Sequence, residues 1–330
     1  MQPLLLTMGD PTGIGPELII KSLLEQSFEQ IQHPIQIIGD VAVLSRAGEV
    51  FDRKGIPEPL GENLYSVHFG DKKLLVHSCS ELDLASVHYG NPGHDCGKAM
   101  AAYVDYAISQ CLEESAAGIV TCPINKAAIN AAGYHFPGHT ELLAERCGVE
   151  KVVMMLAGER LKVCLVTTHL PYRDVPTQLS HREILRTIKI TAQAFRQQFG
   201  IEQPRLAVLA LNPHASENGL FGDEEEKIIT PAIKAAQAAG IAASGPHSAD
   251  TLFHFAAKGA YDAVICMYHD QGLIPLKLLH FDDAVNVTLG LPIIRTSVDH
   301  GTAYDLAGTG KANTASLIAA LKMAEQMADN

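Results

Sequence analysis

Three histidines each follow a short apolar segment of strand length, and imidazole is the side chain that most often binds metals and transfers protons near neutral pH. Each stands just beyond such a segment: His169 after residues 162–167, His214 after residues 205–211 and His269 after residues 262–267. Parallel strands end at one edge of their sheet, so the three imidazoles are predicted to reach one edge. Three nitrogen ligands with an open position are typical of a catalytic Zn²⁺ site, which would also accept Co²⁺, Ni²⁺ or Fe²⁺.

For any single histidine, a satisfied core or surface position is the more common interpretation. The chain has 15 histidines, but three in the same structural context favour a shared role. Asp250 and Asp270 are predicted near the same edge, where they could orient the ligands or take a proton. The alternatives are a helix cap for Asp250 and a turn residue for Asp270.

A second group of residues is cationic or polar: Lys277, Asn286, Arg295 and the pair His139-Thr140. Lysine supplies a point charge and arginine a two-pronged donor, and both suit phosphate or carboxylate. In a chain of net charge −12, cations beside apolar strands indicate an anionic small-molecule ligand. The alternative is a pair of solvated surface charges.

The composition excludes several classes of protein. The chain has 330 residues, with 25 Lys+Arg against 37 Asp+Glu, which argues against a nucleic-acid binder. Hydrophobic residues make up 47% without a run long enough to span a membrane, so a soluble globular protein is expected. Seven cysteines without a CxxC pair and an N-terminus unlike a signal peptide predict reduced thiols and a cytoplasmic location.

Short Val-, Ile- and Leu-rich segments alternate with helical patterns, which predicts an α/β fold with a largely parallel sheet. The length favours two packed domains with the site in a cleft between them. Several helix signals stand out: Pro16 at a helix start, Asp95 as a cap, the capping box Ser180 to Glu183, Pro231 as a break within 223–239, and a last helix over 314–327.

Two glycine-rich loops are candidate nucleotide sites. Residues 9–13 lack the Lys-Ser/Thr of a P-loop, and Leu18 stands where a dinucleotide fingerprint requires a small residue, so a tight strand-to-helix turn is favoured there. The stronger candidate is the small-residue loop 300–313 before the last helix.

The motif His300-Gly-Thr-Ala-x-Asp-Leu-Ala-Gly is similar to the adenosine-binding loop of the isocitrate and isopropylmalate dehydrogenases. Further blocks resemble the 4-hydroxythreonine-4-phosphate dehydrogenase family of pyridoxal phosphate biosynthesis: Met8-Gly-Asp-Pro-x-Gly-Ile-Gly-Pro-Glu17, Gly138-His-Thr-Glu141, Thr168-His-Leu-Pro171, Asn212-Pro-His214, Met267-Tyr-His-Asp-Gln-Gly272 and residues 288–303. The resemblance runs from residue 4 to the last helix. It implies two α/β/α domains like those of isocitrate and isopropylmalate dehydrogenase.

The resemblance also implies roles for single residues. The metal ligands would be His169, His214 and His269, one of them reaching in from the other subunit of a homodimer with the active site at the subunit interface. The substrate-binding residues would be His139, Thr140, Lys277, Asn286 and Arg295, and the cofactor loop would include Gly301, Thr302, Ala303, Asp305 and Gly308. The expected cofactors are NAD or NADP and a divalent metal, Zn²⁺ with Mg²⁺ or Co²⁺ as alternatives.

The reaction implied is the oxidation of 4-phosphooxy-L-threonine at C3 to a β-keto acid, which decarboxylates to 3-amino-2-oxopropyl phosphate. A hand-over of this product to pyridoxine 5'-phosphate synthase is expected. Asp250, Asp270 and a water stay open as acceptors of the hydroxyl proton. The domains are expected at residues 1–134 with 296–330, carrying the cofactor loop, and at 135–295, carrying the metal and substrate residues and the dimer contacts.

Two departures from the family pattern bear on the substrate. Ser216 stands where many members have glycine, and Asp282-Asp283 stand where others have a glycine and an arginine. D-threonate or D-erythronate 4-phosphate is therefore the alternative substrate. A metal-dependent phosphoester hydrolase is the alternative from another class, because the same metal and phosphate groups serve it. A ligand-binding regulator without activity is the third.

Overall fold

The computed structural model describes residues 1–134 and 139–330, and the chain divides into two compact units. Unit 1 comprises Met1–Glu150 and Leu291–Asp329, and unit 2 comprises Lys151–Gly290 with Asn330. The sequence placed these boundaries near residues 134 and 295. The first lies later because α5 (His139–Arg146) is tied to unit 1 by the ion pair of Arg146 with Asp105 (2.8 Å). The second lies earlier because Arg295 already pairs with Ile119 of unit 1.

Unit 1 is built on a sheet with the strand order β13 (Arg295–Val298), β6 (Gly118–Thr121), β1 (Leu4–Thr7), β2 (Ile35–Gly39), β5 (Lys72–Ser78), β4 (Leu64–Phe69) and β3 (Ile56–Gly61). The first five run parallel, and β4 and β3 continue the sheet antiparallel. The parallel strands β13, β6 and β1 are buried along their whole length. The outer strand β3 is exposed at every residue and contains Pro57 and Pro59.

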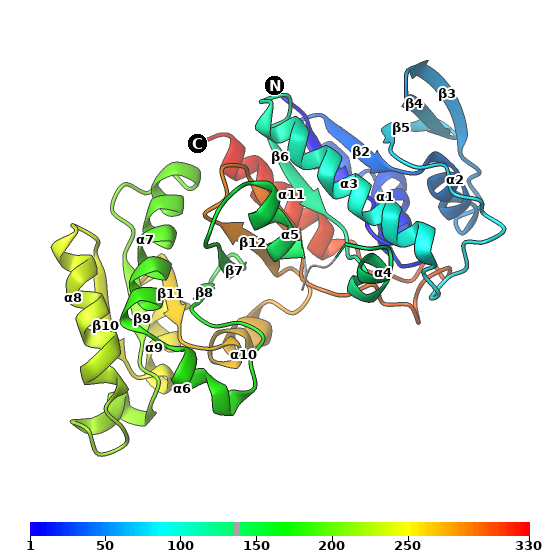
Figure 1. Ribbon diagram of the computed structural model, residues 1–330. Helices are drawn as coiled ribbons and strands as arrows, with labels where there is room; N and C mark the ends of the chain where they lie inside the picture. Colours follow the sequence, from blue (N-terminus) through cyan, green and yellow to red (C-terminus); the bar gives the residue numbers. More distant parts are fainter. Residues whose placement is uncertain (135–138) are drawn as a thin grey trace. The chain divides into compact units, whose positions relative to one another are not determined.

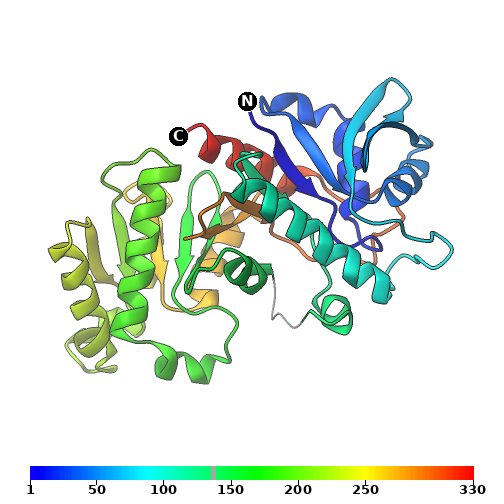
Figure 2. The ribbon, with the colours of Figure 1, turned by 45° about the horizontal axis from the view of Figure 1, so that its top comes forward.

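The helices of unit 1 are α1 (Gly15–Leu24), α2 (Val41–Glu49), α3 (His94–Leu112), α4 (Lys126–Ala131), α5 and α11 (Ala315–Ala328), with a short 3₁₀ turn at Ser27–Gln30. Because α1 carries the chain from β1 outward to β2 and α3 carries it back from β5 to β6, right-handed crossovers put α1 and α3 on opposite faces of the sheet. Figures 1 and 2 show α3 running along one face.

The predicted cap of α3 is wrong by two residues. The helix begins at His94 with Gly93 as its N-cap, and Asp95 lies in the first turn without capping it. There its carboxylate still interacts favourably with the helix dipole. Side-chain caps do form at two other helices of this unit: Asp40 accepts from the backbone N–H groups of Ala42 and Val43 at the start of α2, and Asn125 accepts from Ala128 N–H at the start of α4.

Unit 2 has the strand order β10 (Ala243–His247), β9 (Leu206–Leu209), β11 (Ala263–Cys266), β8 (Lys162–Leu165), β7 (Val153–Ala157) and β12 (Val285–Leu289). The first four run parallel, and β7 and β12 are antiparallel to their neighbours. Its helices are α6 (Val175–Gln178), α7 (His181–Gln198), α8 (Thr230–Ala238), α9 (Ala249–Ala256) and α10 (His269–Leu279), with turns at Tyr172–Asp174, Pro213–Glu217 and Glu225–Ile229.

Two helix signals of unit 2 agree with the structure. The Ser180 hydroxyl accepts from the backbone N–H of Glu183 (3.2 Å), as the capping box predicts. The break expected around Pro231 is present. A π-helical turn at Glu225–Ile229 passes directly into α8, whose second residue is Pro231. Pro231 has no N–H to donate to a carbonyl of the preceding turn, and a local change of helix type is a common response to such a gap.

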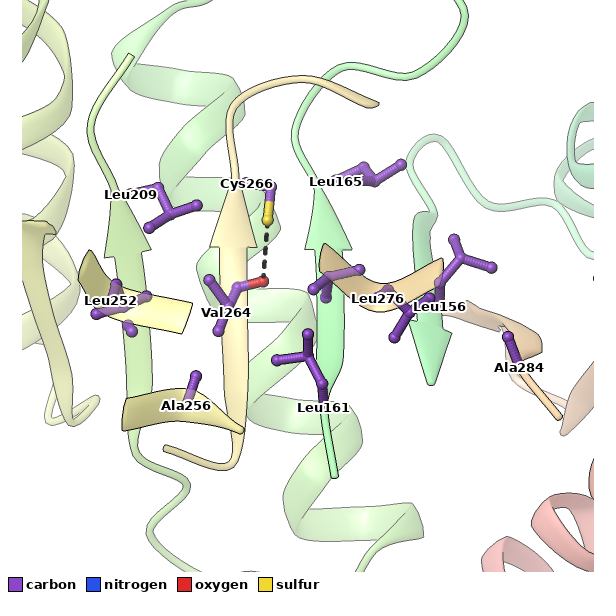
Figure 3. Packing of buried hydrophobic residues seen from close by; sticks show 12 residues of the cluster. Leu156, Leu161, Leu165, Leu209, Leu252, Ala256, Val264, Cys266, Leu276 and Ala284 are labelled. Atoms are coloured by element: carbon purple, nitrogen blue, oxygen red, sulfur yellow. Dashed lines mark hydrogen bonds between the residues drawn. The ribbon is translucent and has the colours of Figure 1, made fainter. Parts of the chain in front are cut away.

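The core of unit 2 lies between its parallel strands and the helices α9 and α10. Figure 3 shows Leu209, Val264 and Leu165 on three neighbouring strands, with Leu252 of α9 and Leu276 of α10 packed over them. All are at most 4% exposed. This core fixes the ends of the strands from which the predicted site residues emerge.

The α/β fold with a mostly parallel sheet is confirmed in both units. No helix among residues 1–134 and 139–330 combines the length and the apolar character that a membrane crossing requires.

Gly158 after β7 offers a test of this packing. A Cβ at this position would lie 2.3 Å from the His280 ring, which is fixed by the Arg160 N–H (3.2 Å) and by Asp283 (3.1 Å). We expect Gly158→Ala to lower the free energy of unfolding by roughly 1–3 kcal/mol, as overpacking does. Urea unfolding measures this. Gly61→Ala, which meets nothing within 4 Å, is the control, and an equal effect of both would contradict the packing argument.

Candidate functional site

His169 and His269 lie side by side in unit 2. Beyond the ends of β8 and β11 the two chains stay together, because Val166 N–H donates to Cys266 O (2.9 Å) and Thr167 Oγ1 donates to Met267 O (2.7 Å). This pairing brings the two imidazole rings to a centroid distance of 5.6 Å. The convergence predicted from the strand ends is found for these two histidines.

The His269 ring is oriented by its neighbour. Its Nδ1 lies 2.7 Å from an Asp270 carboxylate oxygen, which holds the proton on Nδ1 and leaves Nε2 as the nitrogen with a free lone pair. Next along the chain, the buried Gln271 accepts from Met267 N–H (2.7 Å) and donates to Ala210 O (2.6 Å). Gln271 thus joins the ends of β11 and β9.

His214 follows β9 on a different path. The residues 214–218 all have a positive φ, between 46° and 66°, so the chain makes a left-handed turn as soon as it passes Pro213. This conformation costs about 1–2 kcal/mol per residue for L-amino acids other than glycine. The exposed His214 lies close to Asp250, whose pKa is lowered first by a hydrogen bond from Ser248 and also by an electrostatic interaction with His214.

The structure therefore brings together two of the three predicted ligands in one chain. Within residues 1–134 and 139–330, no three His, Cys, Asp or Glu side chains are grouped so that they could hold a metal ion. Asp250 is in the first turn of α9, with Ser248 as the N-cap. Asp270 is paired with His269 at the start of α10.

Lys277 and Asn286 are the substrate candidates of unit 2. Lys277, half-buried on α10, has its ammonium 5.7 Å from the centroid of the Phe281 ring. The Asn286 side-chain oxygen is buried and has no hydrogen-bond partner among the described residues. A buried polar atom of this kind indicates a ligand or water that completes its bonding.

Arg295 is the cationic candidate of unit 1. It is 2% exposed on β13, and its guanidinium donates to Thr121 Oγ1 on β6 (2.7 Å). Burial lowers the pKa of Arg295 to about 10. An anion bound at this guanidinium would offset the cost of burying the charge.

The candidate cofactor loop of unit 1 is held by a buried carboxylate. Glu17, 1% exposed on α1, accepts from the backbone N–H groups of Gly308 and Gly310, the latter at 2.8 Å. Gly308 has a φ of +81°, and a Cβ there would lie 2.7 Å from the Tyr89 ring. Thr302 O accepts from Ile14 N–H (3.1 Å), which fixes the other end of the loop.

A second buried acid anchors the same loop through Tyr304. Asp10 is fully buried and accepts from Tyr304 OH (2.6 Å) and from Thr12 N–H (2.8 Å), while Asn125 donates to the same phenol oxygen (2.6 Å). Burial, together with Asp10, raises the pKa of Tyr304 to about 12. The phenol therefore stays protonated and keeps its hydrogen bond at neutral pH.

The remaining predicted residues have fewer described contacts. Gly301 is exposed, as is Asp305, and Ala303 adopts a positive φ of 43°. Gly138 of the Gly138-His-Thr-Glu141 block lies outside the described residues. His139 is described only as the first residue of α5, and Thr140 is half-buried.

Three residues that shape the site were not singled out from the sequence: Glu17, Glu225 and Gln271. Glu17 and Gln271 stand inside blocks quoted for the resemblance, and Glu225 is one of the acidic residues in the predicted helix 223–239. All three act on backbone groups far along the chain or on another strand. Local patterns carry no signal for such contacts.

Two dehydrogenases are among the solved structures that share this architecture. A 4-hydroxythreonine-4-phosphate dehydrogenase from Klebsiella pneumoniae matches with a TM-score of 0.85 and 39% identity, covering 100% of this chain and 98% of that chain. A terephthalate 1,2-cis-dihydrodioldehydrogenase from Burkholderia xenovorans LB400 matches with a TM-score of 0.67 and 27% identity, covering 98% of each chain. The fold and the matched chains define the class of this protein as an α/β oxidoreductase.

The family is established by the sequence matches. Residues 30–324 match the model of the pyridoxal phosphate biosynthetic protein PdxA. A 4-hydroxythreonine-4-phosphate dehydrogenase of Geobacter metallireducens is 53% identical over 325 residues, 98% of this chain and 95% of that protein. The chain belongs to the PdxA family, and the resemblance seen in its motifs is confirmed.

The left-handed turn after Pro213 can be tested by replacing alanine with glycine at two positions. The change should have opposite effects on the free energy of unfolding at the two. Ala215→Gly relieves a positive φ of 52°, so we expect it to raise the free energy of unfolding by about 1 kcal/mol. Ala235→Gly, inside α8, should lower it by about 1 kcal/mol. Urea unfolding compares the two variants, and a destabilised Ala215→Gly protein would show that the turn is not strained.

Proposed function

We propose that this chain oxidises 4-phosphooxy-L-threonine at C3 with NAD⁺ or NADP⁺, within pyridoxal phosphate biosynthesis. The hydroxyl group loses its proton and C3 loses a hydride, which gives a β-keto acid and reduced cofactor. Loss of CO₂ from this acid yields 3-amino-2-oxopropyl phosphate, which we propose is handed to pyridoxine 5'-phosphate synthase. The observation that carries the proposal is the near full-length match to relatives that are named for this substrate.

Five polar or charged side chains are proposed to bind the substrate. In this proposal Arg295, Lys277 and Asn286 hold the anionic ends of the substrate, together with His139 and Thr140. The burial of Arg295 and the unsatisfied side-chain oxygen of Asn286 support this role. Fixing both ends of the substrate orients C3, so binding energy contributes to the rate through positioning.

The histidines fit a divalent metal, Zn²⁺ or one of the alternatives Mg²⁺ and Co²⁺. The ring centroids of His169 and His269 lie 5.6 Å apart. Asp270 accepts a hydrogen bond from Nδ1 of His269, so the lone pair that can bind a metal is on Nε2. We propose that His214 supplies the third nitrogen. A divalent cation, when bound, lowers the pKa of a hydroxyl group and polarises a carbonyl group. Asp250, close to His214, and Asp270 are the candidates that accept the hydroxyl proton, and a water is the third.

The loop 301–310 is the proposed cofactor site, with Gly301, Thr302, Ala303, Asp305 and Gly308. Its support is the way Glu17 and Asp10 hold it in one conformation, because a preformed loop loses less entropy on binding. The loop presents small residues and exposed backbone, which allow close approach of a dinucleotide. We propose a cytoplasmic location as well, since all seven cysteines are free thiols.

We also propose that the site is completed in a homodimer. One chain does not group three ligands within its described residues. Unit 2 exposes several large apolar side chains near the site: Tyr172 71%, Ile274 67%, Leu278 85% and Phe281 76%. Ile274 and Leu278 lie one turn apart on α10, the helix that begins with His269. A second copy of this chain would cover this face and bring its own site residues near.

A D-threonate or D-erythronate 4-phosphate substrate stays as the alternative, because Asp282 and Asp283 reduce the positive charge beside Asn286. Asp283 is engaged by His280 (3.1 Å), which accounts for one of the two acids. A panel of phosphorylated hydroxy acids with NAD⁺ and NADP⁺ separates the substrates by the rate of cofactor reduction. Release of inorganic phosphate without cofactor reduction would instead identify a phosphoester hydrolase.

Removing His214 tests the metal role. We expect His214→Ala to lose both tightly bound Zn²⁺ and turnover, because the cation loses a nitrogen ligand. Metal content after gel filtration and the absorbance of reduced nicotinamide measure the two effects. His181→Ala, at an exposed histidine that begins α7, is the control. Full turnover of a metal-free His214→Ala protein would refute the proposal.

A charge on the apolar face tests the dimer. We expect Leu278→Glu to convert the protein to a monomer, because two carboxylates would be buried without partners in the interface. Sedimentation velocity gives the oligomeric state. The control Leu112→Glu changes an exposed leucine of unit 1 in the same way and should stay dimeric. A dimer that survives Leu278→Glu unchanged would place the interface elsewhere.

A further inference from the structure

The chain that leaves β9 is held by one buried carboxylate. Glu225 is 3% exposed, and its Oε1 accepts from the backbone N–H groups of Leu211 and Asn212, both at 2.8 Å. Its Oε2 accepts from the Asn212 side-chain amide (2.9 Å), and Glu224 accepts the other amide hydrogen (2.7 Å). Glu225 thus receives three N–H groups from the two residues before Pro213.

The segment after Pro213 requires such a hold. His214 is the first of five residues in the left-handed conformation, which an unrestrained chain of L-residues avoids. The turn is closed by Ser216 O, which accepts from the N–H groups of Gly219 and Phe221, both at 3.1 Å. Glu225 fixes where the turn begins, and hence the point and direction from which the His214 imidazole projects.

We propose that Glu225 is a positioning residue for His214, acting through Asn212. The inference rests on the proposed function, in which His214 binds the metal. Partners that orient a ligating histidine typically change metal affinity about 10- to 100-fold when they are removed. Glu225 orients the imidazole indirectly, by binding the backbone of the segment that carries it.

The exchange of Glu225 for glutamine keeps size and removes one acceptor. In Glu225→Gln the new amide faces the Asn212 amide, donor against donor. Asn212 can resolve this by turning its side chain round, but its oxygen then faces the Glu224 carboxylate. In the double variant Glu224→Gln/Glu225→Gln both neighbours carry amides, so a turned Asn212 accepts from both. The double variant should therefore recover much of what the single variant loses.

The test is Zn²⁺ affinity, measured on the purified full chain by competition with a chromogenic chelator. We expect Glu225→Gln to bind Zn²⁺ about 10- to 100-fold more weakly than the unmodified protein. The double variant should bind more tightly than Glu225→Gln. Saturating Zn²⁺ should restore turnover to Glu225→Gln and leave His214→Ala inactive. Glu226→Gln, the same change at the exposed next residue, is the matched control and should bind normally.

The outcomes separate the two proposals. If His214→Ala loses Zn²⁺ while Glu225→Gln binds as the unmodified protein does, the positioning role is wrong and the proposed function stands. If His214→Ala binds Zn²⁺ normally, both are wrong. If Glu225→Gln does not fold, as judged by circular dichroism, Asn212→Ala decides. It removes the side-chain amide that donates to Glu225 and leaves the backbone N–H in place, and unchanged Zn²⁺ affinity in this variant would overturn the inference that Glu225 acts through Asn212.

Discussion

Backbone N–H groups in the loops that follow parallel strands must find acceptors, and this chain supplies buried carboxylates. Four acids do so, all at most 3% exposed: Asp10, Glu17, Asp40 and Glu225. Asp40, after β2, accepts from Ala42 N–H (2.9 Å) and Leu82 N–H (2.9 Å), joining two loops. A buried carboxylate without such donors would cost several kcal/mol, so each acid and its loop depend on one another.

This dependence explains why the candidate site is rigid where it consists of loops. Glu17 and Asp10 hold the small-residue loop of unit 1, and Glu225 holds the segment before His214. Removal of any one acid leaves backbone donors unsatisfied rather than merely loosening a side chain. The loops that carry candidate site residues can therefore lack helices and strands and still adopt one defined conformation.

The sequence predicts best what depends on local periodicity. The strand Gly118–Thr121 and the Ser180 cap agree with the structure residue by residue, because apolar runs and capping boxes are local signals. The strands β7 and β12 were not predicted. The pairing of β12 with β7 joins segments far apart in the chain, whereas β7 also forms a hairpin with the predicted strand β8 and was missed all the same. The convergence of His169 and His269 could be predicted, because each follows the end of a parallel strand. The path of His214 could not, because a left-handed turn formed by Ala215 and Ser216 contradicts the preferences of those residues.

The outer strand β3 has a consequence for assembly. Pro57 and Pro59 both lack an amide hydrogen, so the free rim of this strand offers an incomplete ladder to any incoming chain. Stacking of further strands onto this rim, the route to fibrous aggregates, is thereby disfavoured. At this edge, association between copies is therefore left to side-chain surfaces, which permit a closed pair instead of an endless polymer.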